Sequence, residues 1–126
     1  MATLRFDGLL VFCQDVPRST RFYTEVLGLT RDPADQADVT VHLPTKGDEH
    51  GGWLLLHPAS GPIQPHPIGT FALADASEVD ALITRVRDAG HTVTEEPHDE
   101  PWGVRQAGIA DPDGYGLTIT APLPAS

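Results

Sequence analysis

The chain of 126 residues has a single cysteine, Cys13, and therefore cannot form an internal disulfide. Such sparing use of cysteine is typical of a reducing compartment, so we expect a cytoplasmic protein. Cys13 falls at a core position of an apolar run and has no cationic neighbour in the sequence. These features indicate an inert buried thiol rather than a nucleophile.

Basic residues and long apolar runs are also scarce. No segment approaches the roughly 20 apolar residues of a membrane span, and the N-terminus lacks the apolar core of a signal peptide. Eight lysines and arginines stand against 18 acidic residues, giving a formal net charge of −10. This field repels phosphate backbones, so we expect neither a nucleic-acid nor a membrane partner. It mildly favours a cationic small molecule, although acidic surfaces also serve solubility.

Familiar catalytic patterns are missing as well. No serine lies in a G-x-S-x-G turn, and the six histidines show neither the HxH nor the HxxxH spacing of a metal site. The acidic run from Glu95 to Glu100 straddles Pro97, which predicts a solvated loop. His98 within it could act as a base if folding brought it to a binding cavity. For Arg105 we predict a structural ion pair.

The most informative segment is PWGVRQAGIADPDGYGLTIT, residues 101–120. It predicts a hairpin, with a strand over 106–110, a turn at Asp111–Gly114 and a strand over 117–120. Proline presets φ at the second turn position and glycine accepts φ > 0, so DPDG between apolar runs is a strong turn signal. The outgoing strand alternates, with Leu117 and Ile119 on one face and threonines on the other.

The rest of the chain predicts the same order of elements twice. In the first half a strand over 8–14 precedes a helix that Asp15 caps and Gly28 ends, and strands follow near 29–31, at 39–43 and at 53–57. In the second half a strand over 68–74 precedes a helix with a capping box at Asp75 and Glu78, which Gly90 ends. A strand over 91–95 and the hairpin complete this half. We therefore expect module 1 at about 1–57, a proline-rich linker at 58–67 and module 2 at about 68–122.

This βαβββ repeat, with FYTEVLGL after the first strand and PWGVR…DPDG before the last, resembles the vicinal oxygen chelate superfamily. That group includes glyoxalase I, extradiol dioxygenases, fosfomycin-modifying enzymes and bleomycin resistance proteins. The resemblance covers nearly the whole chain. It implies an α+β fold in which two tandem βαβββ modules form curved mixed sheets, with a helix on the outer face of each. The concave face of the sheets forms a cup.

Enzymes of this superfamily hold a divalent metal in the cup through His, Gln or Glu side chains. By motif spacing, the corresponding positions here are Gly8, Leu54, Ile68 and Thr118. Divalent cations need several converging His, Asp or Glu donors, and these four side chains do not supply them. We therefore expect no metal and no other cofactor, and a character closest to the bleomycin-resistance branch.

Strand alternation assigns a mostly apolar lining to the cup, with a few neutral polar groups, which suits a flat organic ligand. Trp102 is placed to stack on a ring, or else to pack. Leu55 and Trp53 are assigned to the core. The residues expected to contact ligand are Phe12, His42, Leu54, Leu56, Thr70, Trp102, Gln106 and Thr118.

The function we expect is sequestration of an aromatic or antibiotic-like ligand by a homodimer, as the resemblance implies, and the net charge favours a cationic ligand. One alternative is a lyase, isomerase or dioxygenase that uses a displaced metal site or metal-free chemistry at His42 and Gln106. Another is a structural or regulatory domain with a collapsed cup. Elemental analysis and the size of the cavity distinguish these possibilities.

Overall fold

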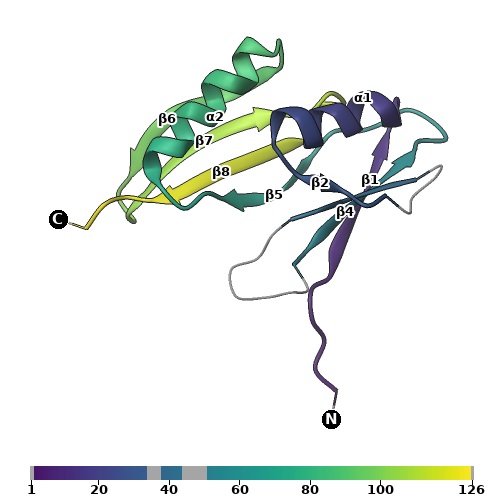
Figure 1. Cartoon of the computed structure of the whole chain (residues 1–126), viewed down its shortest axis with the longest axis horizontal. Coiled ribbons are helices and arrows are strands. Elements are labelled where there is room, and N and C mark those ends of the chain that lie inside the picture. Colours follow the sequence, from purple (N-terminus) through teal and green to yellow (C-terminus); the bar gives the residue numbers. More distant parts are fainter. Residues whose placement is uncertain (1, 34–37, 44–50, 126) are drawn as a thin grey trace. The chain divides into compact units, whose positions relative to one another are not determined.

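The computed structural model describes residues 2–33, 38–43 and 51–125 of the chain. These fall into two compact units, Met1–Ile63 and Gln64–Ser126, and the boundary lies inside the proline-rich segment. Each unit contains a four-stranded mixed sheet and helical segments (Figure 1). The architecture is the expected α+β fold with two βαβββ modules. Most of the predicted loop at 44–52, including His50, lies outside the described residues.

Unit 1 contains β1 (Gly8–Cys13), α1 (Val16–Arg21), the π-helical turn η1 (Phe22–Val26), β2 (Thr30–Arg31), β3 (Val39–His42) and β4 (Trp53–Pro58). The sheet order is β1-β4-β3-β2, with β1 and β4 parallel. Asp15 caps α1 as predicted, because its Oδ1 accepts a hydrogen bond from the backbone N–H of Arg18 at 3.1 Å. Gly28, with φ of 77°, follows the helical segment in a conformation that favours glycine.

One face of the unit 1 sheet packs under the helical segments. Its buried residues are Val11, Cys13, Val39, Val41, Leu54 and Leu56. Leu56 is the register partner of both Val11 and Val39, so these three side chains share a face. The prediction that Leu54 and Leu56 line the open face is therefore wrong. The run WLLLH is apolar on both faces, so alternation within β4 does not show which face lies under the helical segments. The register of β4 with β1 and β3 decides it.

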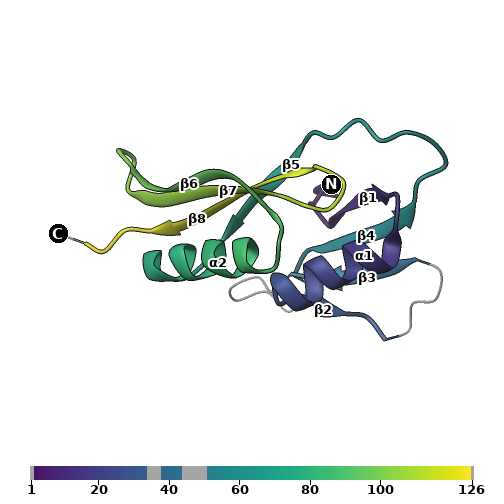
Figure 2. The ribbon, with the colours of Figure 1, turned by 90° about the horizontal axis from the view of Figure 1, so that it is seen from above.

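Unit 2 contains β5 (Pro67–Ala72), α2 (Ala76–Asp88), β6 (Thr92–Glu100), β7 (Val104–Ala110) and β8 (Gly116–Pro122), with sheet order β5-β8-β7-β6. The helix α2 runs along one face of this sheet (Figures 1 and 2). Its buried stripe is the predicted one and consists of Val79, Leu82, Ile83 and Val86. The capping box is present, since Glu78 Oε1 accepts a hydrogen bond from the Asp75 N–H at 2.9 Å.

The DPDG turn joins β7 to β8 as predicted. Asp111 is buried, and its Oδ1 accepts hydrogen bonds from the backbone N–H groups of Asp113 and Tyr115, each at 2.9 Å. Gly114 has φ of 92°, which other residues rarely adopt. The turn is thus held by a carboxylate that satisfies two backbone donors.

The acidic run 95–100 is not a solvated loop, and that prediction is wrong. It forms the second half of β6, which pairs with β7 through Glu100 and tolerates Pro97 because β6 is the edge strand of the sheet. The register shifts between Val93 and Glu95 and again between Glu95 and His98. Pairing with a buried neighbouring strand outweighs the low strand propensity of this segment.

Arg105 forms the structural ion pair that the sequence predicts. Its guanidinium donates two hydrogen bonds to Asp80 of α2, at 2.7 and 2.9 Å, and one to Asp99 of β6 at 2.8 Å. The hydrogen bonds from Arg105 lower the pKa of Asp80 below its ordinary value of 3.8. This arrangement links α2 to two strands on the helix-covered side of the sheet.

We expect Arg105→Ala to reduce the midpoint of urea unfolding modestly at neutral pH, and Arg105→Lys to reduce it less. A lowered carboxyl pKa contributes stability above the ordinary pKa of 3.8, and this contribution is lost as the pH falls through the lowered value. The difference between wild type and Arg105→Ala should therefore shrink in acid and in high salt. A difference that grows as the pH falls would contradict this account.

Candidate functional site

The open face of the unit 1 sheet is rich in apolar and aromatic groups. Leu10 is 52% exposed and Phe12 is 44% exposed, and both belong to β1, an edge strand of the sheet. Leu10 is the register partner of Leu55, and Gly8 is the partner of Trp53. Phe12 and His42 lie where the sequence placed them, and Trp53 and Leu55 take the open-face positions that had been assigned to Leu54 and Leu56.

Carboxylates hold the ring nitrogens at the border of this face. His57 Nδ1 lies 2.7 Å from Asp38 Oδ1, and the rings of His57 and Phe12 form a T-shaped pair with 5.8 Å between their centroids. The indole Nε1 of Trp53 donates a hydrogen bond to Asp7 Oδ2 at 3.1 Å. These contacts fix the orientation of two flat side chains beside an exposed apolar surface.

The open face of the unit 2 sheet is more polar. Thr70 pairs with Thr118, and Thr118 in turn pairs with Gly108 of β7. Gln106, the register partner of Thr120, donates a weak hydrogen bond to Glu95 at 3.4 Å. Thr70, Thr118 and Gln106 therefore lie on the face predicted for them.

Trp102 differs from its predicted place. It lies in the turn between β6 and β7 rather than on the strand, and it is 68% exposed. The sequence PWG forms a turn, in which Gly103 adopts φ of 93° and its N–H bonds back to the carbonyl of Glu100 at 3.0 Å, so β7 begins only at Val104. In unit 2 considered alone, Trp102 is an exposed side chain at the tip of a hairpin.

A cluster that the sequence did not predict lies on the same open face of unit 2. His98 Nε2 is 2.5 Å from Glu100 Oε1 and 3.0 Å from Glu95 Oε1. The hydrogen bond with the backbone carbonyl of Glu96, followed by that with Glu100, raises the pKa of His98. In a regular strand Glu95 would lie on the face opposite to His98 and Glu100, because odd and even positions alternate. Strand alternation therefore does not predict this cluster.

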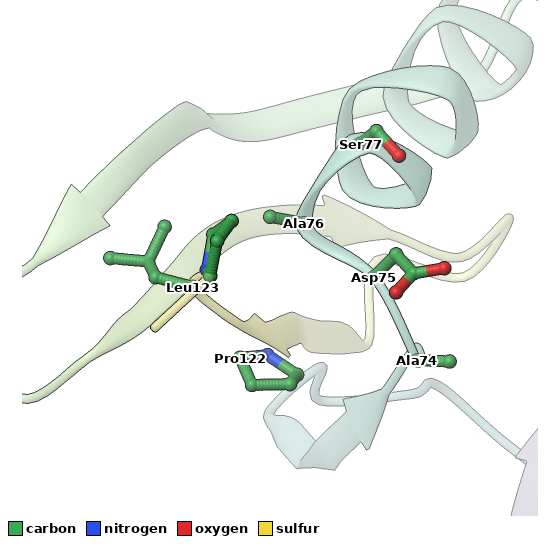
Figure 3. Close-up of a pocket in the computed structure, with 7 residues that line it drawn as sticks. Ala74, Asp75, Ala76, Ser77, Pro122 and Leu123 are labelled. Carbon is green, nitrogen blue, oxygen red and sulfur yellow. The ribbon is translucent and has the colours of Figure 1, made fainter. Parts of the chain in front are cut away.

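A pocket in unit 2 lies between the start of α2 and the end of β8 (Figure 3). Its lining consists of Ala74, Asp75, Ala76, Ser77, Pro122, Leu123 and Pro124. Asp75 serves the helix cap, and Ser77 is the other polar side chain. This lining offers neither a nucleophile with a base nor a convergent donor set.

A model of the Glyoxalase/Bleomycin resistance protein/Dioxygenase superfamily matches residues 5–119. The chain belongs to this superfamily. It is 33% identical over 106 residues to the anthracycline biosynthesis protein DnrV of Streptomyces peucetius, covering 78% of this chain and 34% of DnrV. It is 31% identical over 113 residues to DauV of Streptomyces sp. (strain C5), covering 83% of this chain and 37% of that anthracycline biosynthesis protein. The chain thus spans about a third of the length of these relatives.

Solved structures support the superfamily fold. A glyoxalase/bleomycin resistance protein/dioxygenase from Nocardioides superposes with a TM-score of 0.72 at 21% identity, covering 100% of this chain and 88% of that one. At this identity the likeness concerns the fold. Within the described residues, no helix has the length and apolarity needed to cross a membrane.

The metal positions of the superfamily do not fit a cation in this chain. Gly8 has no side chain, and the Trp53 indole fills the space where one would start, since a Cβ at Gly8 would lie 2.2 Å from Trp53 Cδ2. The buried Leu54 and the half-buried Ile68 are hydrocarbons, and Thr118 offers a neutral hydroxyl. On β4, Leu55 and not Leu54 lies on the open face, and its hydrocarbon side chain cannot bind a metal either. The donor chemistry at these positions disagrees with that of the superfamily's metalloenzymes.

Proposed function

We propose that this chain binds and sequesters a small, planar and largely apolar organic molecule on the open face of unit 1. The exposure of Leu10 and Phe12 beside Trp53 and Leu55 carries the proposal. Exposed apolar side chains that gather on one sheet face are a signal of a binding surface, whereas single ones are ordinary. A flat ligand matches a face whose aromatic groups are held in fixed orientations.

The binding energy in this proposal comes from apolar burial. Covering a Phe or Leu side chain completely contributes about 1.5–3 kcal/mol, and a favourable ring–ring contact adds about 0.5–1.5 kcal/mol. Ordering the ligand offsets part of this gain. Because the interaction is not chiefly ionic, the affinity should vary little with salt unless the ligand carries a positive charge, which the net charge of −10 would attract.

The names of the two relatives support a narrower ligand class for this proposal. Both are named for anthracycline biosynthesis. Anthracyclines are fused-ring aromatic molecules, and a planar ring system suits an apolar face with aromatic groups. We therefore propose an anthracycline-like, antibiotic-related ligand. A homodimer in the cytoplasm, in which a second copy completes the binding surface, belongs to the same proposal and is tested by sedimentation with and without ligand.

A fluorescence titration tests the proposed function. Trp102→Phe leaves Trp53 as the single tryptophan, and the probes are an anthracycline and smaller fused-ring aromatics. We expect saturable quenching, weakened about tenfold by Phe12→Ala, which corresponds to about 1.4 kcal/mol of lost contact. Leu4→Ala is the control, because Leu4 is 98% exposed outside the sheet, and it should bind normally. Absence of saturable quenching, or equal affinities for all variants, would contradict the proposal.

One observation favours a second candidate, a metal-free lyase or isomerase. The 2.7 Å contact from Asp38 to His57 Nδ1 holds an imidazole at the edge of the proposed ligand surface, and a carboxylate-oriented histidine is a common general base. In this case His57→Gln would abolish conversion of a bound ligand, followed by mass spectrometry, and leave Trp53 quenching intact. An unchanged ligand after prolonged incubation with wild type would favour sequestration.

A further inference from the structure

The distorted strand β6 gathers three potential ligand groups on one face. Its two register shifts place Glu95 opposite Gly108, His98 opposite Gln106 and Glu100 opposite Val104. Bulges of this kind commonly re-aim side chains next to functional sites. As a result, one ligand atom from each of Glu95, His98 and Glu100 lies within 4.8 Å of the other two.

The orientation of the His98 ring indicates what lies between these groups. Nδ1 is 2.9 Å from the backbone carbonyl oxygen of Glu96, so this nitrogen carries a proton and donates it. Nε2 then faces Glu100 Oε1 and Glu95 Oε1. In the metal-free protein a proton on Nε2 offsets these two carboxylates, and a divalent cation that displaced this proton would meet the same three ligand atoms. Metal-binding histidines characteristically have their second nitrogen fixed by such a backbone carbonyl.

The other two carboxylates of β6, those of Glu96 and Asp99, form ion pairs with arginines. Glu96 forms an ion pair with Arg87 of α2, and Asp99 forms one with Arg105. Among the described residues, no arginine or lysine forms an ion pair with Glu95 or Glu100. Within the part of the chain that the structure describes, His98 is the one basic side chain that pairs with them, and Gln106 adds a weak hydrogen bond to Glu95.

We propose that Glu95, His98 and Glu100 form a binding site for a divalent transition-metal cation. One imidazole nitrogen and two carboxylates suit zinc, manganese, nickel or cobalt better than calcium or magnesium, which prefer oxygen ligands throughout. Glu100 is the most buried ligand, with 18% of its side chain exposed, and Glu95 and His98 are open enough for water to complete the coordination. The site lies on β6, whereas the superfamily's metal positions lie on β1, β4, β5 and β8, and it goes beyond the proposed ligand binding.

Isothermal titration of tag-free, chelator-treated full-length protein with zinc chloride tests this site. We expect one zinc per chain with a micromolar or lower Kd, weakened at least tenfold by Glu100→Gln and by His98→Ala. Glu96→Gln is the matched control, because it removes a neighbouring carboxylate whose ion pair goes to Arg87, and it should bind zinc as wild type does. Circular dichroism establishes that each variant is folded.

Two results would overturn the proposal. One is binding of zinc in the millimolar range by wild type, and the other is equal loss of affinity in Glu96→Gln and Glu100→Gln, which would indicate diffuse attraction by the acidic surface. Cobalt absorption provides a second readout, since nitrogen and oxygen ligation in a low-symmetry site gives visible bands that Glu100→Gln should change. Quenching of Trp53 by aromatic ligands reports on unit 1, so failure of either proposal is recognisable separately.

Discussion

Replacing Leu56 with alanine is expected to lower the free energy of unfolding by about 2–5 kcal/mol. Leu56 is fully buried and shares the helix-covered face with Val11 and Val39, so truncation leaves a cavity in the unit 1 core. The measurement is urea unfolding followed by circular dichroism. Ligand affinity, measured by Trp53 quenching on the folded fraction, should change little because Leu56 points away from the open face.

Leu55→Ala is the matched control for Leu56→Ala, because it deletes the same atoms from the adjacent position on the opposite face. Leu55 is half-buried, so the stability loss should be clearly smaller, while ligand binding should weaken. The reverse pattern, with Leu55 controlling stability and Leu56 controlling affinity, would show that the faces of β4 are assigned incorrectly.

Gly8→Ala is the second substitution with a large expected effect, about 1–3 kcal/mol of lost stability from overpacking. A Cβ at this position would lie 2.2 Å from Trp53 Cδ2 and 2.4 Å from the Trp53 carbonyl oxygen. The indole could turn aside, but the carbonyl belongs to the paired strand, so β1 and β4 would have to separate locally. Urea unfolding measures the loss, and the Trp53 emission maximum should shift to longer wavelength.

Gly61→Ala is the control for Gly8→Ala, since a Cβ at Gly61 meets nothing within 4 Å. It should leave stability unchanged or raise it by about 0.4–1 kcal/mol through the unfolded state. If Gly8→Ala were equally neutral, the indole would not occupy the superfamily's metal position. Introducing histidine at residue 8 would then be a reasonable route to a metal-binding variant.

The repeated order of elements was accessible to sequence reasoning because local signals agreed with one another. The capping box at Asp75 and Glu78, the glycine at 28 and the DPDG turn each specify a backbone conformation within a few residues. Such features need no knowledge of distant partners. They therefore predicted the order of helices and strands correctly.

The sequence did not predict the features that depend on pairing between strands. In β4 both parities are apolar, so the face of Leu54 and Leu56 depends on register with β1 and β3. In β6 two register shifts and an internal proline disguise a strand as a loop, and the same shifts bring Glu95 and His98 together. Both errors have one cause, because alternation identifies a face only in a regular strand with one polar side.

The central claim is that the open face of unit 1 holds an aromatic ligand without a metal at the superfamily's positions. The crystal structure of the protein soaked with an anthracycline tests it most directly. We predict a ring system in contact with Phe12, Leu10 and Leu55, and no metal density beside Gly8 or Thr118. A ligand seated elsewhere, or coordinated to a cation at those positions, would contradict the account.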